Sequence, residues 1–263
     1  MHDSLNRLFG LEGQVALVTG GSRGLGLQIA TALGDAGAKV MLSSRKTGDL
    51  EDAAAELRGR GIDVRIVSAD VSDASAAGDV VAATLVAFGR LDVLVNNAGA
   101  TWGAPAEDYP VDAWDKVMNV NARSLFTFSQ AAGRAWMIPN RSGRIINVAS
   151  VAGLGGNPPA MMTVAYNASK AAAINLARAL ACEWGKYGIN VNAIAPGFFP
   201  TRMTKGLLAE WGAENVSKHS PLGRLGGDDD LKGAALLLAT AAGAHITGQV
   251  IVVDGGASAI VGS

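Results

Sequence analysis

The sequence predicts an α/β fold: a single domain over residues 1–263, with a doubly wound parallel sheet of about seven strands and helices on both faces. Three observations predict it. Short, continuously apolar runs alternate with longer segments of helical periodicity. No Pro-rich or Ser-rich linker divides the chain. Apolar residues make up 49% of the chain and charged residues 17%, a balance that supports one sizeable core.

In the first half of the chain, each predicted strand is a short apolar run. The strands are expected at residues 15–18, 40–42, 64–67 and 91–95, and the helices at residues 25–36, 49–60 and 73–88. Gly37 and Gly61 follow the first two helices, in the position where a glycine commonly ends a helix.

The second half of the chain continues the alternation. Helices are predicted at residues 111–137, 164–184 and 228–241, and strands at residues 144–148, 190–194 and 249–253. The rhythm breaks at residues 198–225, an irregular segment that contains Pro200 and Pro221. A segment that follows a strand's carboxyl end can cover the ligand crevice of an open α/β sheet, so we expect residues 198–225 to be a substrate lid.

Composition argues against several classes of partner. The net charge is −1 and no basic stripe is present, so we expect no nucleic-acid partner. The single cysteine, Cys182, allows no intrachain disulfide. The N-terminus lacks the pattern of a secretory signal, and the most apolar long run, residues 234–244, is too short to span a bilayer. We therefore expect a soluble cytoplasmic protein with no membrane partner and no metal site.

A glycine-rich turn follows the first predicted strand. It reads Thr19-Gly20-Gly21-Ser22-Arg23-Gly24-Leu25-Gly26 and opens the first helix. Glycines at positions 20, 24 and 26 allow a tight turn and let a pyrophosphate approach the backbone at the helix N-terminus. Because the turn lies between a strand and a helix in a repeating βα pattern, it predicts a dinucleotide site that includes Ser22 and Leu25.

The end of the second strand indicates which dinucleotide binds. NAD-binding folds usually place an acidic residue there, but this chain has Ser44 and Arg45, and no acid appears until Asp49. Arg45 and Arg23 can hold a 2′-phosphate, with Ser44 as a hydrogen-bond donor. The sequence therefore predicts NADP(H).

The segment from Tyr166 to Lys170 places a phenol and an amine four residues apart, on one face of a predicted helix. A nearby ammonium group favours the phenolate and is expected to lower the pKa of the tyrosine. Such a pair can donate or accept a proton near neutral pH.

The chain resembles the short-chain dehydrogenase/reductase family, a Rossmann-type fold, over nearly its whole length. The resemblance is carried by motifs that occur in the family's order: Thr19-Gly20-x-x-x-Gly24-x-Gly26, Asn96-Asn97-Ala98-Gly99, Asn121, Ser150, Tyr166-x-x-x-Lys170 and Pro196-Gly197-x-x-x-Thr201. Each motif alone is common, whereas their joint occurrence in order is highly specific.

The resemblance implies a catalytic tetrad of Asn121, Ser150, Tyr166 and Lys170. Tyr166 is then the general acid in ketone reduction, and Lys170 lowers its pKa and binds the nicotinamide ribose. Ser150 binds the substrate oxygen, and Asn121 holds a water that links Lys170 to solvent. Further cofactor contacts are implied on Asp70 and Val71 at the adenine, Asn97 and Gly99 at the adenosine ribose, and Pro196, Gly197 and Thr201 at the nicotinamide.

One departure from the family pattern concerns spacing. Ser150 and Tyr166 are 16 residues apart, whereas 12 or 13 is common in the family. The extra residues lie in the loop of residues 157–163, which carries Met161 and Met162. We expect this loop to border the substrate pocket with an adaptable apolar wall.

Several segments look like bacterial 3-ketoacyl reductases of the rhamnolipid branch, notably residues 97–103, 109–111 and 195–204. The expected pocket is apolar and consists of Trp102, Met161, Met162, Phe198, Phe199 and Met203, which favours a 3-oxoacyl thioester as the small-molecule carbonyl substrate. An acyl carrier protein is less favoured, because Arg141 matches one docking arginine of the family but Tyr187 occupies the other position.

Two alternatives stay open. One is a sugar-acid dehydrogenase that resembles gluconate 5-dehydrogenases, for which Arg202, Lys205 and His219 of the lid would meet a carboxylate or phosphate. The other is a non-catalytic NADP(H)-sensing protein, against which the presence of all four tetrad residues counts. The resemblance further implies a homotetramer formed through the two long helices and the C-terminal strand.

Overall fold

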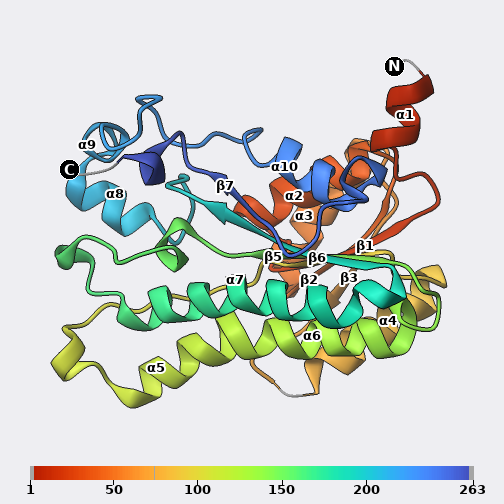
Figure 1. The fold of residues 1–263 in the computed structure, drawn as a ribbon, viewed down its shortest axis with the longest axis horizontal. Coiled ribbons are helices and arrows are strands. Elements are labelled where there is room, and N and C mark those ends of the chain that lie inside the picture. The colour runs from red at the N-terminus through yellow and green to blue at the C-terminus, as the bar shows by residue number, and fades with distance from the viewer. Residues whose placement is uncertain (1–2, 74, 261–263) are drawn as a thin grey trace.

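The computed structural model describes residues 3–73 and 75–260, and its centre is a parallel sheet of seven strands in the order β3-β2-β1-β4-β5-β6-β7 (Figure 1). The strands are β1 (Val15–Thr19), β2 (Lys39–Ser44), β3 (Val64–Ser68), β4 (Val93–Asn96), β5 (Gly143–Val148), β6 (Ile189–Pro196) and β7 (Val250–Val253). The predicted fold class and all seven strands are confirmed, with bounds that shift by a residue or two.

The strand order reverses between β1 and β4, and this reversal determines where a ligand can bind. Thr19, the last residue of β1, lies beside Ser43 of β2 and Asn96 of β4, and Asn96 lies beside Asn147 of β5. The turns that follow these strands therefore meet at one edge of the sheet. In open α/β sheets, the ligand crevice lies outside the carboxyl ends of the strands at such a switch point.

Helices cover both faces of the sheet (Figure 1). One face carries α2 (Gly24–Asp35), α3 (Thr47–Gly59) and α10 (Lys232–Ala239), and the other carries α4 (Ala76–Phe88), α6 (Ser124–Ala132) and α7 (Val164–Trp184). Because neighbouring side chains of a strand point to opposite faces, Val18 packs in the first core and Leu17 in the second. Both cores consist almost entirely of aliphatic side chains.

The helix predicted at residues 111–137 is continuous but not regular. It begins as α5 (Val111–Met118), passes through a π-helical turn at Asn119–Arg123 into α6, and ends in a second π-helical turn at Gly133–Met137. Isolated π-helical turns inside α-helices are frequent at functional sites, and the first of these turns contains Asn121.

Two predicted helices start later than expected. The helix predicted from residue 73 begins at Ala76, after a turn in which Asp73 Oδ1 accepts a hydrogen bond from the Ser75 amide at 3.0 Å, and residue 74 of that prediction lies outside the described residues. The helix predicted at residues 228–241 forms only as α10, because the carboxylate of Asp230 accepts bonds from Arg224 and the Gly227 amide and holds the preceding residues in a turn. The N-terminal α1 (Asp3–Phe9) was not predicted, and none of its residues is buried.

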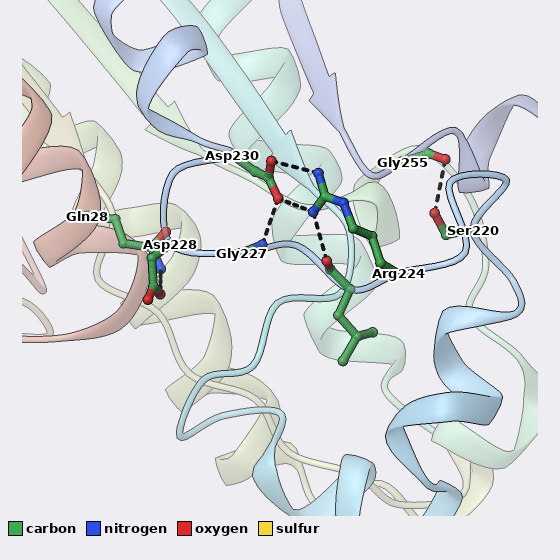
Figure 2. Close-up of polar contacts among 8 residues, drawn as sticks. Gln28, Ser220, Arg224, Gly227, Asp228, Asp230 and Gly255 are labelled. Atoms are coloured by element: carbon green, nitrogen blue, oxygen red, sulfur yellow. Dashed lines mark hydrogen bonds and ion pairs between the residues drawn. The ribbon is translucent and has the colours of Figure 1, made fainter.

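The segment predicted as a lid contains two short helices, α8 (Lys205–Trp211) and α9 (Ala213–Ser217), which lie beyond the carboxyl end of β6 (Figure 1). Figure 2 shows the contacts at the end of this segment. The Arg224 guanidinium donates to the Asp230 carboxylate, and the Ser220 hydroxyl donates to the Gly255 carbonyl at 3.0 Å. Nearby, Gln28 of α2 donates to Asp228 at 3.0 Å. No helix in the described part of the chain combines the length and apolarity needed to cross a bilayer.

Candidate active site

A cleft of about 1390 Å³ follows the carboxyl ends of β1, β2, β4 and β5. Many of the predicted site residues line it together: Gly20, Ser22, Arg23, Gly24, Leu25, Ser44, Arg45, Asp70, Val71, Asn97, Gly99, Trp102, Tyr166, Lys170, Thr201 and Met203. The fold thus brings the predicted dinucleotide turn and the predicted proton donor to one cavity.

The glycine turn has the backbone that its composition suggests. Gly20 and Gly24 have φ angles of 63° and 54°, in the left-handed region that disfavours other residues. A Cβ atom on Gly26 would lie 2.4 Å from Asn97 Nδ2, so this glycine permits close packing. Asn97 donates from Nδ2 to the carbonyls of Thr19 and Gly20, both at 3.0 Å. The Asn97 side chain therefore holds the glycine turn against the end of β4.

The part of the cleft lined by Ser44, Arg45 and Asp70 offers groups that suit a phosphorylated dinucleotide. Ser44 Oγ is buried and has no hydrogen-bond partner among the described residues, so its hydroxyl can donate a hydrogen bond to a ligand. The carboxylate of Asp70 accepts two bonds from Ser72. Burial acts to raise the pKa of Asp70, but these bonds and Arg45 together lower it. The residues present fit a dinucleotide, whereas no group of three His, Cys, Asp or Glu side chains within residues 3–73 and 75–260 is arranged to hold a metal ion.

Lys170 is a buried amine one helical turn after Tyr166 on α7. Its Nζ donates to the Val148 carbonyl at 2.8 Å and lies 5.5 Å from the centroid of the Tyr166 ring. Only 4% of the residue is exposed, and this burial lowers the pKa of Lys170 to about 8.

Tyr166 differs from the sequence expectation in the direction of its pKa shift. Burial raises the pKa of Tyr166, and a hydrogen bond with Ser150 lowers it by less. The expected lowering by Lys170 is not among the causes of this shift, and the Lys170 ammonium group donates to the Val148 carbonyl instead. In the protein without ligands, Tyr166 is therefore a protonated phenol at neutral pH.

Ser150 lies next to Tyr166 despite the long spacing between them. Its Oγ accepts a hydrogen bond from the Ala152 amide at 3.2 Å at the start of a short 3₁₀ turn. A Cβ atom on Gly153 would lie 2.6 Å from the carbonyl carbon of Lys170, so this turn packs directly on α7. The extra residues fall after the turn and leave the serine in contact with the tyrosine.

Asn121 is fully buried, and protein groups use both ends of its side chain. Oδ1 accepts from the Ala100 amide at 2.7 Å, and Nδ2 donates to the Ala100 carbonyl at 2.8 Å and to Ser169 Oγ at 2.9 Å. A Cβ atom on Gly99 would lie 3.6 Å from Asn121 Oδ1 and 3.7 Å from Lys170 Nζ, so both groups meet at this glycine. Asn121 thus ties the loop after β4 to α7 beside the lysine.

The loop of residues 157–163 is a constrained segment and contributes no lining to the cleft. Asn157 Nδ2 donates to Thr163 Oγ1 at 2.9 Å and to Asn167 Oδ1 at 3.2 Å. Met162 has a φ angle of 48°, and its carbonyl accepts a bond from the Ala104 amide at 3.0 Å. The loop therefore joins the segment after β4 to the start of α7, and its Met162 side chain is exposed.

The remaining predicted residues lie behind or beside the cleft. Pro196 ends β6 in the core, and a Cβ atom on Gly197 would lie 2.7 Å from Asp254 Cβ. Phe198 and Phe199 line a separate cavity of about 130 Å³ between the lid and β7. Phe199 is only 3% exposed and lies against Gly226, so its predicted place in the substrate pocket is not supported.

Comparison with known proteins identifies the family. A sequence model of the short chain dehydrogenases matches residues 14–211. The chain belongs to the short-chain dehydrogenase family. The predicted resemblance is therefore confirmed, and this short-chain dehydrogenase is an oxidoreductase.

Its relatives include enzymes of two substrate types. It is 39% identical to gluconate 5-dehydrogenase of Gluconobacter oxydans, over 95% of this chain and 96% of that protein. It is 42% identical to the rhamnolipids biosynthesis 3-oxoacyl-[acyl-carrier-protein] reductase of Pseudomonas aeruginosa, over 94% and 97%. Its fold matches a gluconate 5-dehydrogenase of Burkholderia cenocepacia in complex with NADP and tartrate, with a TM-score of 0.91, 34% identity and coverage of 98% and 100%.

Sequence reasoning missed several residues of this short-chain dehydrogenase that bear on the site. Ser169 is buried, accepts the bond from Asn121 and donates to the Tyr166 carbonyl at 2.8 Å. Lys46, Lys116 and Leu208 line the cleft. Ser169 lies inside the Tyr166-to-Lys170 motif at the helix position before the lysine, a small polar residue on a packed helix, and that pattern is the signal that could have identified it.

Proposed function

We propose that this protein is an NADPH-dependent reductase of 3-oxoacyl thioesters, converting the ketone into a secondary alcohol. The observation that carries the proposal is the apolar part of the cleft lining, which includes Trp102, Met203 and Leu208. An acyl chain can lie on such a surface, whereas a polyol needs many buried polar partners. The similarity to the Pseudomonas 3-oxoacyl reductase supports this choice.

The cofactor would be held by the glycine turn, Ser44 and the two arginines at the adenosine end. When bound, its nicotinamide supplies the hydride. Arg23 and Arg45 line the cleft and suit a 2′-phosphate, because a guanidinium group presents a planar fork of donors. The NADP in the Burkholderia relative supports NADP(H) as the cofactor here.

Tyr166 and Ser150 would act on the substrate oxygen. In reduction, the carbonyl carbon gains a hydride and the oxygen gains the Tyr166 proton, which leaves a phenolate to be reprotonated. The high pKa of Tyr166 keeps the phenol protonated before the reaction. The Ser150 hydroxyl would donate a hydrogen bond to the same oxygen and stabilise its developing negative charge.

Lys170 and Asn121 would serve the proton supply and the cofactor. A lysine with a pKa of about 8 can exchange protons near neutral pH, which suits a group that helps to reprotonate Tyr166. The Asn121 side chain is occupied by Ala100 and Ser169, so a relay water would bind to main-chain groups of the π-helical turn. The side chain itself would hold that turn in place.

A second candidate is a sugar-acid dehydrogenase like the Gluconobacter relative. Arg202 and Lys205 favour it, because both line the cleft on the lid, are exposed and form no ion pair with another described residue. In contrast, Arg23 pairs with Asp49 and Arg45 with Asp70. Free cations at the substrate end suit a carboxylate, although the phosphates of coenzyme A would meet the same groups.

A panel assay decides between the two candidates. NADPH oxidation would be measured with acetoacetyl-CoA, a longer 3-oxoacyl-CoA, 5-ketogluconate and a simple diketone. We expect the longer thioester to give the highest kcat/KM, because it covers more of the apolar lining. Strong turnover of 5-ketogluconate alone would contradict the proposal and establish the second candidate.

Carrier-protein docking, assembly and location also belong to the proposal. Arg141 precedes β5, at the sheet edge opposite the cleft, and donates to the Lys186 carbonyl at 2.7 Å. A carrier protein bound there would therefore not reach the cleft of the same chain directly. We expect a homotetramer in the cytoplasm and a single domain with residues 198–225 as its lid.

A further inference from the structure

Two arginine–carboxylate pairs line the part of the cleft proposed to hold the adenosine. Arg23 Nη1 donates to Asp49 Oδ2 at 2.7 Å, and Arg45 Nη1 lies 3.9 Å from Asp70 Oδ2. All four residues line the cleft. Both arginines that suit a 2′-phosphate therefore already face a negative partner, and the Arg23 pair is the closer one.

Asp49 holds its position for a reason independent of Arg23. It lies in the first turn of α3, where the helix dipole favours a negative side chain. Its side chain is 35% exposed and that of Arg23 is 48% exposed, so the pair is a surface ion pair of the kind that exchanges at small cost. An incoming anion can replace Asp49 as the ion-pair partner of Arg23, but the Asp49 carboxylate then remains next to the bound anion.

The two cofactors differ in what they bring to this position. A phosphate monoester carries a charge of about −1.5 to −2 near neutral pH, whereas a ribose hydroxyl is neutral and can donate to a carboxylate. Asp49 therefore competes with the phosphate for Arg23 and repels it, but it is compatible with the hydroxyl. Ser44 Oγ, buried and unpartnered among the described residues, can donate to either ligand.

We propose that Asp49 determines how strongly this protein prefers NADP(H) to NAD(H), by competing with the 2′-phosphate for Arg23. This inference rests on the proposed cofactor site. Asp49 acts through Arg23 and is a specificity residue that moderates the preference for NADP(H). A chain with Asp49 intact accepts NAD(H) more readily than its two arginines alone would suggest.

Asp49→Asn tests this inference through cofactor binding, without any substrate. Dissociation constants for NADPH and NADH would be measured by isothermal titration calorimetry on the full chain, after circular dichroism has confirmed the fold. We expect Asp49→Asn to bind NADPH roughly three- to fivefold more tightly, the range that a surface ion pair allows, with no gain for NADH. The gain should shrink at high salt because the charges are exposed.

Asp52→Asn is the matched control. It removes the same charge from the same helix at an exposed residue outside the described lining of the cleft, so it reports any long-range effect. The double variant Arg23→Ala/Asp49→Asn should bind NADPH no more tightly than Arg23→Ala alone, because Asp49 acts through Arg23. Equal NADPH-to-NADH ratios in Asp49→Asn and Asp52→Asn, or weaker NADPH binding in Asp49→Asn, would overturn the inference.

The same titrations separate this inference from the proposed function. If the unaltered chain binds neither NADPH nor NADH, the proposed cofactor site is wrong and the role of Asp49 falls with it. If the unaltered chain binds NADPH and the ratio does not respond to Asp49, only the inference fails.

Discussion

Burial shifts the pKa values of two titratable side chains in the candidate site. Burial raises the pKa of Tyr166 and lowers the pKa of Lys170 to about 8, because burial disfavours the charged form of each group. For Tyr166 this means a proton is available for reduction at neutral pH. As pH rises through the raised pKa, the phenol is lost, so reduction should decline only in the alkaline range while alcohol oxidation, which needs the phenolate, should increase.

Tyr166→Phe tests the acid at the residue scale. The variant keeps the ring and its contact with Lys170 but has no proton to donate, so we expect ketone reduction to fall by about 10² or more. Single-turnover NADPH oxidation would measure the loss, and NADPH titration should give an affinity close to that of the unaltered chain. Tyr187→Phe, on the turn before β6, is the control and should reduce a small thioester normally. Undiminished reduction by Tyr166→Phe would show that another group supplies the proton.

At the scale of elements, the loop between Ser150 and α7 combines strain with a network of hydrogen bonds. Met162 adopts a left-handed conformation that an unbranched residue reaches only at a cost. The Asn157, Thr163 and Asn167 side chains, together with the bond from the Ala104 amide, hold it there. Strain of this kind persists only where the surroundings determine the conformation.

Met162→Gly should relieve this strain. Glycine reaches a φ of 48° freely, so we expect the variant to be as stable as the unaltered chain or more stable by up to about 1 kcal/mol, despite the entropy cost of a glycine. Met161→Gly removes a similar side chain from a helical turn and should destabilise the protein instead. Chemical denaturation of both variants makes the comparison. A clear loss of stability in Met162→Gly would mean that its side chain, not its backbone, holds the loop.

The sequence predicts elements whose pattern is local and misses features that depend on packing. Buried strands such as β1 and β4 are continuous apolar runs, and the glycine turn is recognisable because its residues carry the backbone geometry. The π-helical turn at Asn121 and the conformation of Met162 arise from contacts with distant segments, including Ala100 and Ala104. The predicted direction of the Tyr166 pKa shift was wrong, because a spacing of four residues does not show how deeply the phenol is buried.

At the scale of the whole molecule, the end of the proposed lid is joined to the turn that precedes α10. Arg224 binds Asp230 through both nitrogens of its fork, and Asp230 also accepts from the Gly227 amide at 2.7 Å (Figure 2). Arg224 is the larger cause that lowers the pKa of Asp230 to about 2. Because the folded-state pKa lies below its ordinary value of 3.8, this pair contributes to stability above that value and loses its contribution as pH falls towards 2.

Asp230→Asn should loosen the lid without unfolding the sheet. The charge-assisted pair is lost, so we expect faster backbone hydrogen exchange in residues 220–231 and unchanged protection in β1. Asp229→Asn is the control, since the Asp229 side chain is 86% exposed and forms its ion pair with Lys232 of α10 and not with Arg224. Equal exchange in the two variants would show that Arg224 and Asp230 do not hold the base of the lid.

Thr201, near the start of the proposed lid segment, lines the cleft next to the glycine turn. A Cβ atom on Gly24 would lie 3.6 Å from Thr201 Cγ2, so the start of the lid reaches over the turn that is proposed to hold the pyrophosphate. A dinucleotide on that turn would lie next to Thr201, whereas Trp102, farther along the same cleft lining, is exposed to solvent. We therefore expect the dinucleotide to bind before the carbonyl substrate and to leave after it, an order that product-inhibition kinetics would measure.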